Sequence, residues 1–414
     1  MSKPIHHPAC FAMGTGDPLS IGGIDLPRLA HQVGQTPFFA YDRTGIFKRV
    51  QMLRFLLPKG IHLHYAIKAN PMPAVVQFLA TQVDGLDVAS GGELGIALDT
   101  LIPRAHISFA GPGKSSHDLL MAMAAGVVLN LESEGELETV FSLSELHGYR
   151  PKVAIRVNPD FELRGSGMRM GGGAKPFGVD VERVPALVRR ILASDLVFQG
   201  FHIFSGSQSL KADALIEAQK NTVDLAIRLV QESGAPLPTL NLGGGFGIPY
   251  FPGESPLELE RVGDALQHLL PHLNQQLPDT QPVIELGRYL VGEAGVYVCR
   301  ILDRKVSRGQ TFLITDGGLH HHLAASGNFG QVIRKNYPVT IVTRKKSPPL
   351  EEVSVVGPLC TPLDLLADKM LLPRAEVGDL VVIYQSGAYG LSASPAAFLG
   401  HPPAREVLIG DLEP

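Results

Sequence analysis

The chain has 414 residues, of which 45% are hydrophobic and 18% are charged, and its formal net charge is −4. This length favours two domains, and the composition is that of a soluble globular enzyme. Nucleic-acid-binding proteins usually carry a positively charged surface, whereas this chain has a small negative net charge, so we expect no nucleic-acid partner.

The cysteines and the hydropathy pattern predict a location. Cys10, Cys299 and Cys360 are odd in number and far apart, which indicates reduced thiols rather than a disulfide framework. No run approaches the roughly 18 apolar residues of a membrane span, and the first residues lack the charged and apolar regions of a signal peptide. We therefore expect a cytoplasmic protein with no membrane partner.

A short aromatic strand at residues 36–42 and a helix at 44–57 come first in the chain. Short apolar runs then alternate with longer helical stretches. The predicted strands cover 62–69, 86–90, 107–111, 127–131, 153–158, 198–204, 240–243 and 283–288. The predicted helices between them cover 74–81, 92–98, 116–125, 134–146, 184–193, 212–231 and 257–277. Eight such units over about 220 residues match an α/β fold of the parallel (β/α)8 TIM type. An open doubly wound sheet gives the same alternation and stays an alternative.

After residue 297 the pattern changes to short strands separated by turns. These strands are predicted at 311–315, 339–342, 352–356, 380–384 and 404–409. We predict a C-terminal β domain at 297–414, joined by the N-terminal segment 1–42 through its strand at 38–41. The barrel domain would then cover 43–296.

The predicted strand at 62–69 carries the first chemical signal. Apolar residues alternate along it, so one face is apolar and the other face ends in Lys68. An ammonium group at the inward-facing end of a strand loses hydration, which favours the neutral amine that forms a Schiff base. A lysine that extends to solvent is the alternative that this stretch alone leaves open.

Polar residues gather at the carboxyl ends of the predicted strands, the face at which barrels place their active sites. They are Lys68, Asp87, Arg156, Asn158, His202, Gly243, Gly244, Gly245 and Glu285. The three glycines allow backbone N–H groups to close around a phosphate, although a flexible turn has the same composition. His202 suits a ring stacked on a planar cofactor, or a buried core histidine. Glu285 suits an ordinary ion pair, or a carboxylate that keeps a pyridine nitrogen protonated.

Six motifs occur in the order of one known family. They are Tyr65-Ala66-Ile67-Lys68-Ala69-Asn70, His202 with its serines, Gly243-Gly244-Gly245-Phe246, Glu285-Leu286-Gly287-Arg288-Tyr289, Cys360 and Gly387-Ala388-Tyr389-Gly390. The chain resembles the pyridoxal-phosphate-dependent decarboxylases with an alanine-racemase-like barrel, which include the diaminopimelate, ornithine and arginine decarboxylases. The resemblance covers nearly the whole chain.

The resemblance implies pyridoxal 5′-phosphate as cofactor and α-decarboxylation of an amino acid as reaction. Lys68 would hold the cofactor, His202 would stack on its ring and Glu285 would pair with the ring nitrogen. The residues implied to hold the phosphate or brace the pocket are Asp87, Glu93, Arg156, Ser205, Gly243, Gly244, Gly245, Gly287, Arg288 and Tyr389. Whether Ser205 or Ser207 contacts the phosphate stays open.

The same resemblance implies a homodimer with shared active sites. Cys360 would come from the other subunit and protonate the carbanion that is left when CO₂ departs. Lys175 and Asp364 match a pair that bridges subunits in relatives.

Departures from the family pattern narrow the substrate. Thr361 follows Cys360 where relatives that bind a distal amine carry an acid, which predicts that diamino acids are poor substrates. Leu286 replaces the usual proline. The segment 318–330 is similar to the subgroup that includes glutamyl-carrier-protein and exosortase-associated decarboxylases. The basic loop at 164–173 is interpreted as a mobile lid for an acidic substrate or an acyl-carrier-protein phosphopantetheine, or as a basic loop without that role.

Other functions remain alternatives at this stage. They are a diaminopimelate decarboxylase proper, an amino-acid racemase, which would place an arginine where Glu285 lies, and a non-catalytic cofactor-binding protein, which would tend to lose Lys68 or Cys360. We expect no metal at His320-His321-His322, because three adjacent histidines cannot all face one ion. The sequence leaves open the substrate, its stereochemistry, whether it is free or carrier-bound, and any oligomer beyond the dimer.

Overall fold

The computed structural model describes residues 20–163, 167–331, 333–343 and 348–411. Cys10 and residues 164–166 of the predicted lid lie outside these ranges. The chain forms two compact units. The barrel unit consists of residues 50–248 and 255–289, and the β unit consists of residues up to 49, 249–254 and the chain from 290 onward. The predicted domain limits at 42/43 and 296/297 stay a prediction.

The barrel unit is a closed ring of eight parallel strands. In ring order they are β4 (His62–Ala66), β5 (Gly85–Val88), β6 (Ile107–Phe109), β7 (Val128–Leu131), β8 (Lys152–Asn158), β11 (Val197–His202), β13 (Thr239–Asn241) and β14 (Gln281–Leu286). Pairing of β7 with β8 and of β14 with β4 closes the ring. The closure confirms the (β/α)8 barrel and excludes the open doubly wound sheet.

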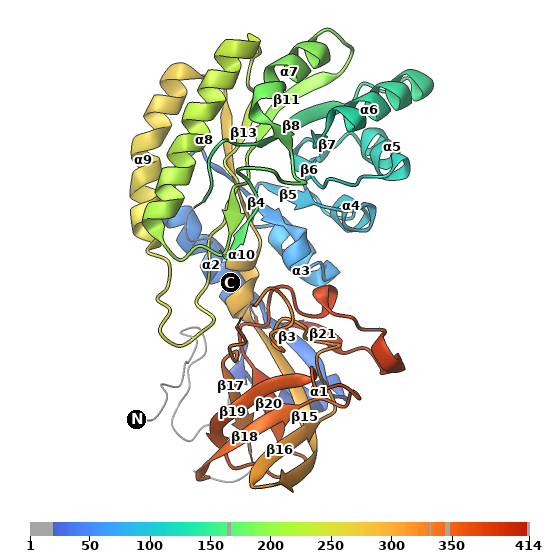
Figure 1. Ribbon diagram of the computed structural model, residues 1–414, viewed down its shortest axis with the longest axis vertical. Coiled ribbons are helices and arrows are strands. Elements are labelled where there is room, and N and C mark those ends of the chain that lie inside the picture. Colours follow the sequence, from blue (N-terminus) through green and yellow to red (C-terminus); the bar gives the residue numbers. More distant parts are fainter. Residues whose placement is uncertain (1–19, 164–166, 332, 344–347, 412–414) are drawn as a thin grey trace. The chain divides into compact units, whose positions relative to one another are not determined.

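Helices cover the outside of this ring (Figure 1). They are α2 (Arg43–Leu56), α3 (Pro73–Ala80), α4 (Gly91–Leu98), α5 (Ser116–Ala125), α6 (Glu134–His147), α7 (Val184–Leu192), α8 (Ala212–Ser233) and α9 (Leu259–Gln276). All eight were predicted. Side chains define several of their starts: the hydroxyl groups of Ser90, Ser115 and Ser133 accept hydrogen bonds from the backbones of the first turns of α4, α5 and α6.

The β unit is built on one long strand, β15 (Gly295–Ser307). The N-terminal strand β3 (Phe38–Asp42) pairs with β15 and with β21 (Arg405–Ile409), so its predicted place in this unit is confirmed. The other predicted strands are present as β16 (Gln310–Thr315), β17 (Val339–Val342), β18 (Leu350–Val356) and β20 (Leu380–Ile383). Inner residues of β3, β15 and β20 form its core together with Leu26, Leu29 and Ala30 of the helix α1 (Leu26–Val33).

Four described strands of the β unit were not predicted: the short β1 (Ser20–Ile21) and β2 (Ile24–Asp25), and the longer β15 and β19 (Leu365–Pro373). The first half of β15 is buried on both faces and most of its second half is exposed, so the strand lacks the alternation that marks a half-buried strand.

Candidate active site

A cavity of about 200 Å³ lies at the carboxyl ends of the barrel strands. Five of the predicted site residues line it: Lys68, Asp87, Arg156, His202 and Glu285. These residues come from β4, β5, β8, β11 and β14 or from the turns that follow them. The closed ring therefore brings together residues as far apart in the sequence as Lys68 and Glu285.

Lys68 lies just beyond the strand on which it was predicted. β4 ends at Ala66, and Ile67–Ala69 form a turn of 3₁₀ helix. The side chain is exposed rather than buried, so the predicted loss of hydration was wrong for this structure. Its Nζ atom lies 5.6 Å from the centre of the Phe204 ring. The amine is therefore part of the cavity wall and is open to an incoming carbonyl group.

Gly287 allows the end of β14 to pack closely against the Lys68 turn. A Cβ atom on Gly287 would lie 2.9 Å from the Cβ of Ala69 and 3.2 Å from the carbonyl oxygen of Ala66. The glycine thus has a spacing role next to the lysine.

Glu285 is held by two neighbours, Asn241 on the adjacent strand β13 and His202 on the next strand, β11. Its Oε2 atom accepts a hydrogen bond of 3.0 Å from Asn241 and lies 3.1 Å from Nε2 of His202. Burial raises the pKa of Glu285, but the nearby His202, Lys68 and Arg156 lower it more, so that the pKa falls well below its ordinary value. Glu285 is therefore an ionised carboxylate inside the cavity. The sequence analysis missed Asn241, which ends β13 directly before the glycine run.

Asp87 is a second buried carboxylate in the cavity wall. It is 8% exposed, and neither of its oxygens has a hydrogen-bond partner among the residues that the structure describes. Its nearest ionic neighbour is Nδ1 of His64, 3.5 Å from Oδ2. Burying a carboxylate without hydrogen-bond donors costs free energy of folding. This arrangement therefore suits a site that is completed by a bound group.

Arg156 is fixed by a buried acid that the sequence analysis missed. Its Nη1 atom donates to Glu132 at 2.9 Å, and its guanidinium lies 5.0 Å from the centre of the Phe177 ring. Glu132 also accepts from the backbone N–H groups of Gly111 at 2.5 Å and Gly178 at 3.2 Å. Glu132 directly follows β7, and a polar residue directly after a buried strand is the signal that singled out other members of the site.

Two further predicted residues lie near this wall. The Glu93 carboxylate accepts from the backbone N–H of Ala89 at 2.8 Å, and burial raises its pKa although Ala89 and Lys68 oppose the shift. Asn158 has a supporting role, because its amide donates to Gly173 at 2.8 Å and accepts from Gly172 at 3.1 Å, at the end of the predicted lid.

The glycine run forms a tight loop after β13. Gly243 and Gly245 have φ angles of +68° and +80°, which disfavour other residues. A Cβ on Gly244 would overlap the carbonyl oxygen of Glu285, and one on Gly245 would lie 2.6 Å from that of Gly206. The loop therefore packs against the segment that follows β11.

That neighbouring segment carries the two candidate serines. Ser205 is buried and Ser207 is half-buried. The backbone N–H of Met170 in the predicted lid donates to the carbonyl oxygen of Ser205 at 3.1 Å, and Ser209 donates to Gly245 at 2.9 Å. The structure thus brings the glycine and serine loops together, and the choice between the two hydroxyls stays open.

The remaining predicted residues lie outside the cavity wall. Arg288 begins the short helix α10 (Arg288–Val291) directly after β14. Cys360, which is exposed, and Tyr389, which has a φ of +53°, belong to the β unit. Their approach to Lys68 stays a prediction, as does the pairing of Lys175 with Asp364 of another subunit.

Two properties of the described residues bear on other functions. No group of three or more His, Cys, Asp or Glu residues within the described ranges could hold a metal ion. None of the helices in that part of the chain is long and apolar enough to span a membrane.

Comparisons with known proteins bear on the chemistry of this site. Residues 43–292 match the family model described as "Pyridoxal-dependent decarboxylase, pyridoxal binding domain". An L-glutamyl-[BtrI acyl-carrier protein] decarboxylase of Niallia circulans is 37% identical over 380 residues, which cover 90% of this chain and 89% of the relative. A 2-[(L-alanin-3-ylcarbamoyl)methyl]-2-hydroxybutanedioate decarboxylase of Staphylococcus aureus is 30% identical over 375 residues, which cover 88% and 92%. The crystal structure of a diaminopimelate decarboxylase from M. jannaschii with L-lysine matches with a TM-score of 0.86 at 26% identity, over 97% of this chain and 92% of that one.

Proposed function

The chain belongs to the pyridoxal-dependent decarboxylases, and on this premise we propose that its substrate is an amino acid whose side chain is joined to a larger group. The first candidate for that larger group is an acyl-carrier protein. The enzyme is a pyridoxal-phosphate-dependent carboxy-lyase.

The residues of the cavity fit this cofactor. The Asp87 carboxylate accepts no hydrogen bond from the described residues, which suits a site that a bound polar group completes. The loop of Gly243, Gly244 and Gly245 has no Cβ atoms, so its backbone N–H groups can approach a phosphate. We assign Lys68 to the cofactor aldehyde, because it is the amine of the cavity wall. The glycine loop and one of the two hydroxyls of Ser205 and Ser207 are assigned to the phosphate, together with Arg288 and Tyr389.

The other side chains have distinct tasks. The bound cofactor supplies an electron sink for the bonding pair that CO₂ leaves behind. Glu285 keeps its negative charge and would stabilise a proton on a cofactor ring nitrogen bound next to it, because the opposite charge stabilises the cation. Asn241 orients that carboxylate, and Glu132 holds Arg156 at the cavity wall. His202, which also lines the cavity, would stack on the cofactor ring. Cys360 of the partner subunit delivers the proton to the substrate carbon in the homodimer that we propose.

The substrate proposal rests on the loop that carries Cys360. Thr361 stands where an acid would bind a distal amine. The next carboxylate in this loop, Asp364, is 3% exposed and accepts backbone hydrogen bonds from Leu319 at 2.6 Å and Leu359 at 2.8 Å. Asp364 is thus committed to holding its own loop. The described loop therefore offers no unpaired carboxylate to the ammonium tail of ornithine, lysine or diaminopimelate.

A mass-spectrometric screen for loss of CO₂ tests this proposal. The cofactor-loaded enzyme is incubated with glutamate, lysine, ornithine, diaminopimelate and glutamyl-carrier protein. We expect CO₂ loss from the carrier-bound substrate and poor turnover of the diamino acids. The variant Thr361→Asp, which restores an acid next to Cys360, should gain activity on the diamino acids. Efficient turnover of ornithine or diaminopimelate by the unchanged enzyme would overturn the proposal, and the latter would favour a diaminopimelate decarboxylase proper.

We also propose a cytoplasmic location. Cys299 and Cys360 are free thiols, which suits a reducing compartment.

A further inference from the structure

We infer that His64 is a positioning residue, which holds the Asp87 carboxylate toward the active-site cavity from a second, polar cavity inside the barrel. The inference rests on the proposed function, because it takes Asp87 as part of the cofactor pocket.

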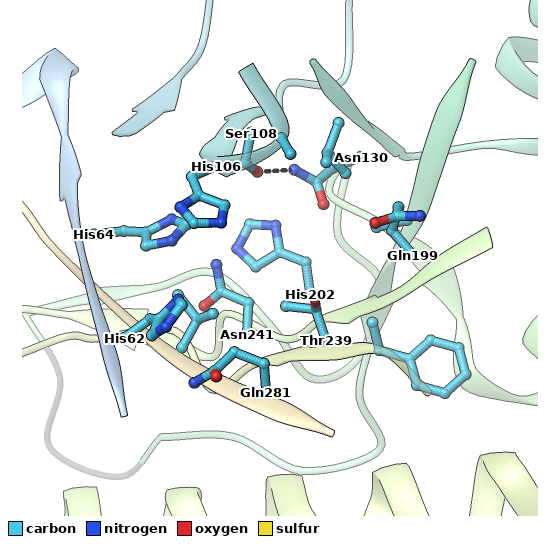
Figure 2. A pocket seen from close by; sticks show the side chains of 15 residues that line it. His62, His64, His106, Ser108, Asn130, Gln199, His202, Thr239, Asn241 and Gln281 are labelled. Carbon is cyan, nitrogen blue, oxygen red and sulfur yellow. Dashed lines mark hydrogen bonds between the residues drawn. The ribbon is translucent and has the colours of Figure 1, made fainter. Parts of the chain in front are cut away.

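The second cavity, here called the inner chamber, has a volume of about 350 Å³. It lies inside the barrel unit around the amino-terminal halves of the strands, since the first residues of β4, β7, β13 and β14 line it. Figure 2 shows the rings of His64, His106 and His202 and the amide of Asn241 turned toward one another around this space. His202 lines the active-site cavity as well, so the two cavities share a wall.

His64 belongs to the same wall. Its ring lines the inner chamber and is 7% exposed, and its Nδ1 atom lies 3.5 Å from Oδ2 of Asp87, which lines the other cavity. Neighbouring strands fix this relation, because His64 is paired with Gly85 and Ala66 is paired with Asp87. In the described part of the chain, neither Nδ1 of His64 nor either oxygen of Asp87 has a hydrogen-bond partner.

These two buried polar groups lie 3.5 Å apart, and neither has a hydrogen bond in the described part of the chain, so a small approach would let them bond to each other. A proton on Nδ1 of His64, directed at Oδ2, would then give the carboxylate a donor that no other described residue supplies. Without that donor, the buried Asp87 would keep the full cost of its lost hydration and would be free to turn away from the cavity. His64 thus acts through Asp87 and does not itself enter the active-site cavity.

Gly85 provides the space for this arrangement. A Cβ atom on Gly85 would overlap Nε2 of His64 and would lie 2.5 Å from the carbonyl oxygen of His106. Gly85 does not have a positive φ angle, so the glycine is required by the imidazole and the His106 carbonyl group beside it and not by its own backbone conformation. Gly85→Ala therefore displaces the His64 ring without removing it.

The test is a double-mutant cycle on cofactor affinity, measured by absorbance titration of the cofactor-free chain with pyridoxal 5′-phosphate. We expect His64→Leu to weaken binding at least about 10-fold, since a hydrogen bond to a buried charge is removed. His64→Asn, whose amide can lie where Nδ1 lies, should restore most of the affinity. In an Asp87→Asn background, His64→Leu should cause no further loss, because two residues that act as one unit are not additive.

The matched control is His62→Leu, which changes a histidine of the same strand and the same chamber that does not face Asp87. It should leave cofactor affinity and kcat unchanged. Thermal unfolding of each cofactor-free variant separates a folding defect from a change in affinity, and Gly85→Ala supplies a second variant that should reproduce His64→Leu.

Three results would overturn the inference: equal losses from His64→Leu in both backgrounds, a loss from His62→Leu as large as that from His64→Leu, or unchanged affinity in His64→Leu. The proposed function can fail separately. An enzyme that binds the cofactor with the expected coupling but releases CO₂ from none of the screened substrates contradicts the substrate proposal and leaves the role of His64 standing.

Discussion

The Oε2 atom of Glu285 lies 3.1 Å from Nε2 of His202, and the Asn241 amide donates to the same oxygen at 3.0 Å. These three residues lie on consecutive strands of the ring, β14, β11 and β13. The register of the barrel therefore places an ionised acid in the wall of the cavity to which we assign the cofactor.

Replacement of Glu285 by glutamine tests the role of this charge. Glu285→Gln keeps the size of the side chain but removes the negative charge, so kcat for CO₂ release should fall at least about 100-fold, as for other groups that stabilise charge in the transition state. Cofactor binding should be retained. Glu217→Gln, a change to an exposed carboxylate of α8, is the control and should have no effect. An unchanged kcat in Glu285→Gln would remove this residue from the catalytic machinery.

The buried pair of Glu132 and Arg156 should contribute much more to stability than an exposed pair. The Glu132 side chain is 2% exposed, whereas Glu138, which pairs with Arg190, is 58% exposed. Glu132→Ala leaves a buried guanidinium without its partner and should lower the free energy of unfolding by about 3–5 kcal/mol. Glu138→Ala should cost less than about 1 kcal/mol. Urea unfolding measures both, and similar losses in the two variants would contradict the assignment of Glu132.

His322 should make the β unit sensitive to mild acid. The side chain is fully buried, its Nε2 atom lies 2.9 Å from the hydroxyl of Ser386, and its Nδ1 atom accepts from the backbone N–H of Ala325 at 3.3 Å. Burial lowers the pKa of His322 to about 3. The unfolded chain, with an ordinary histidine pKa near 6.5, therefore binds the proton first as the pH falls. The stability that depends on neutral His322 is complete above about pH 6.5 and is lost progressively below it, by about 2 kcal/mol at pH 5.

Urea unfolding between pH 7.5 and pH 5 measures this effect. His322→Gln should be less stable at pH 7.5 but should show a shallower loss of stability on acidification than the unchanged chain. His147→Gln, at an exposed position, should keep the full loss. Parallel curves for His322→Gln and the unchanged chain would show that His322 is not the group responsible.

The proposed homodimer can be tested by mixing two inactive variants. If each active site uses Lys68 of one subunit and Cys360 of the other, a heterodimer of Lys68→Ala and Cys360→Ala chains contains one intact site. Random exchange at equal concentrations makes half of all dimers heterodimers, so activity should return to roughly a quarter of that of the unchanged enzyme. Recovery of no activity after exchange that is demonstrated by mass spectrometry would place both residues in the same subunit.

The sequence predicted the barrel well because each short apolar run is followed in the chain by a helical stretch. Few folds are compatible with this alternation of strands and helices. It also placed Lys68, Asp87, Arg156, His202 and Glu285 on one face, because all of them follow strands whose carboxyl ends meet at one end of the ring. The sequence pattern did not predict the last residue of each strand. Ile67, for example, continues the apolar alternation, although it already belongs to a 3₁₀ helix.

The missed residues have a common physical reason. Glu132, Asn241 and His64 act through contacts between neighbouring strands, and these contacts depend on register, which a single sequence does not specify. Their residue types are ordinary for strand ends and core positions. Only the closed ring shows that each of them faces a charged member of the cavity.

The most direct test of the central claim is chemical trapping of the cofactor. Borohydride reduction of the loaded enzyme, followed by peptide mass spectrometry, should find the cofactor mass on the peptide that contains Lys68. The variant Lys68→Ala should lose both the visible absorption band and the release of CO₂, while the exposed-site variant Lys220→Ala should keep both. A label on a different lysine, or a normal visible band in Lys68→Ala, would contradict the account.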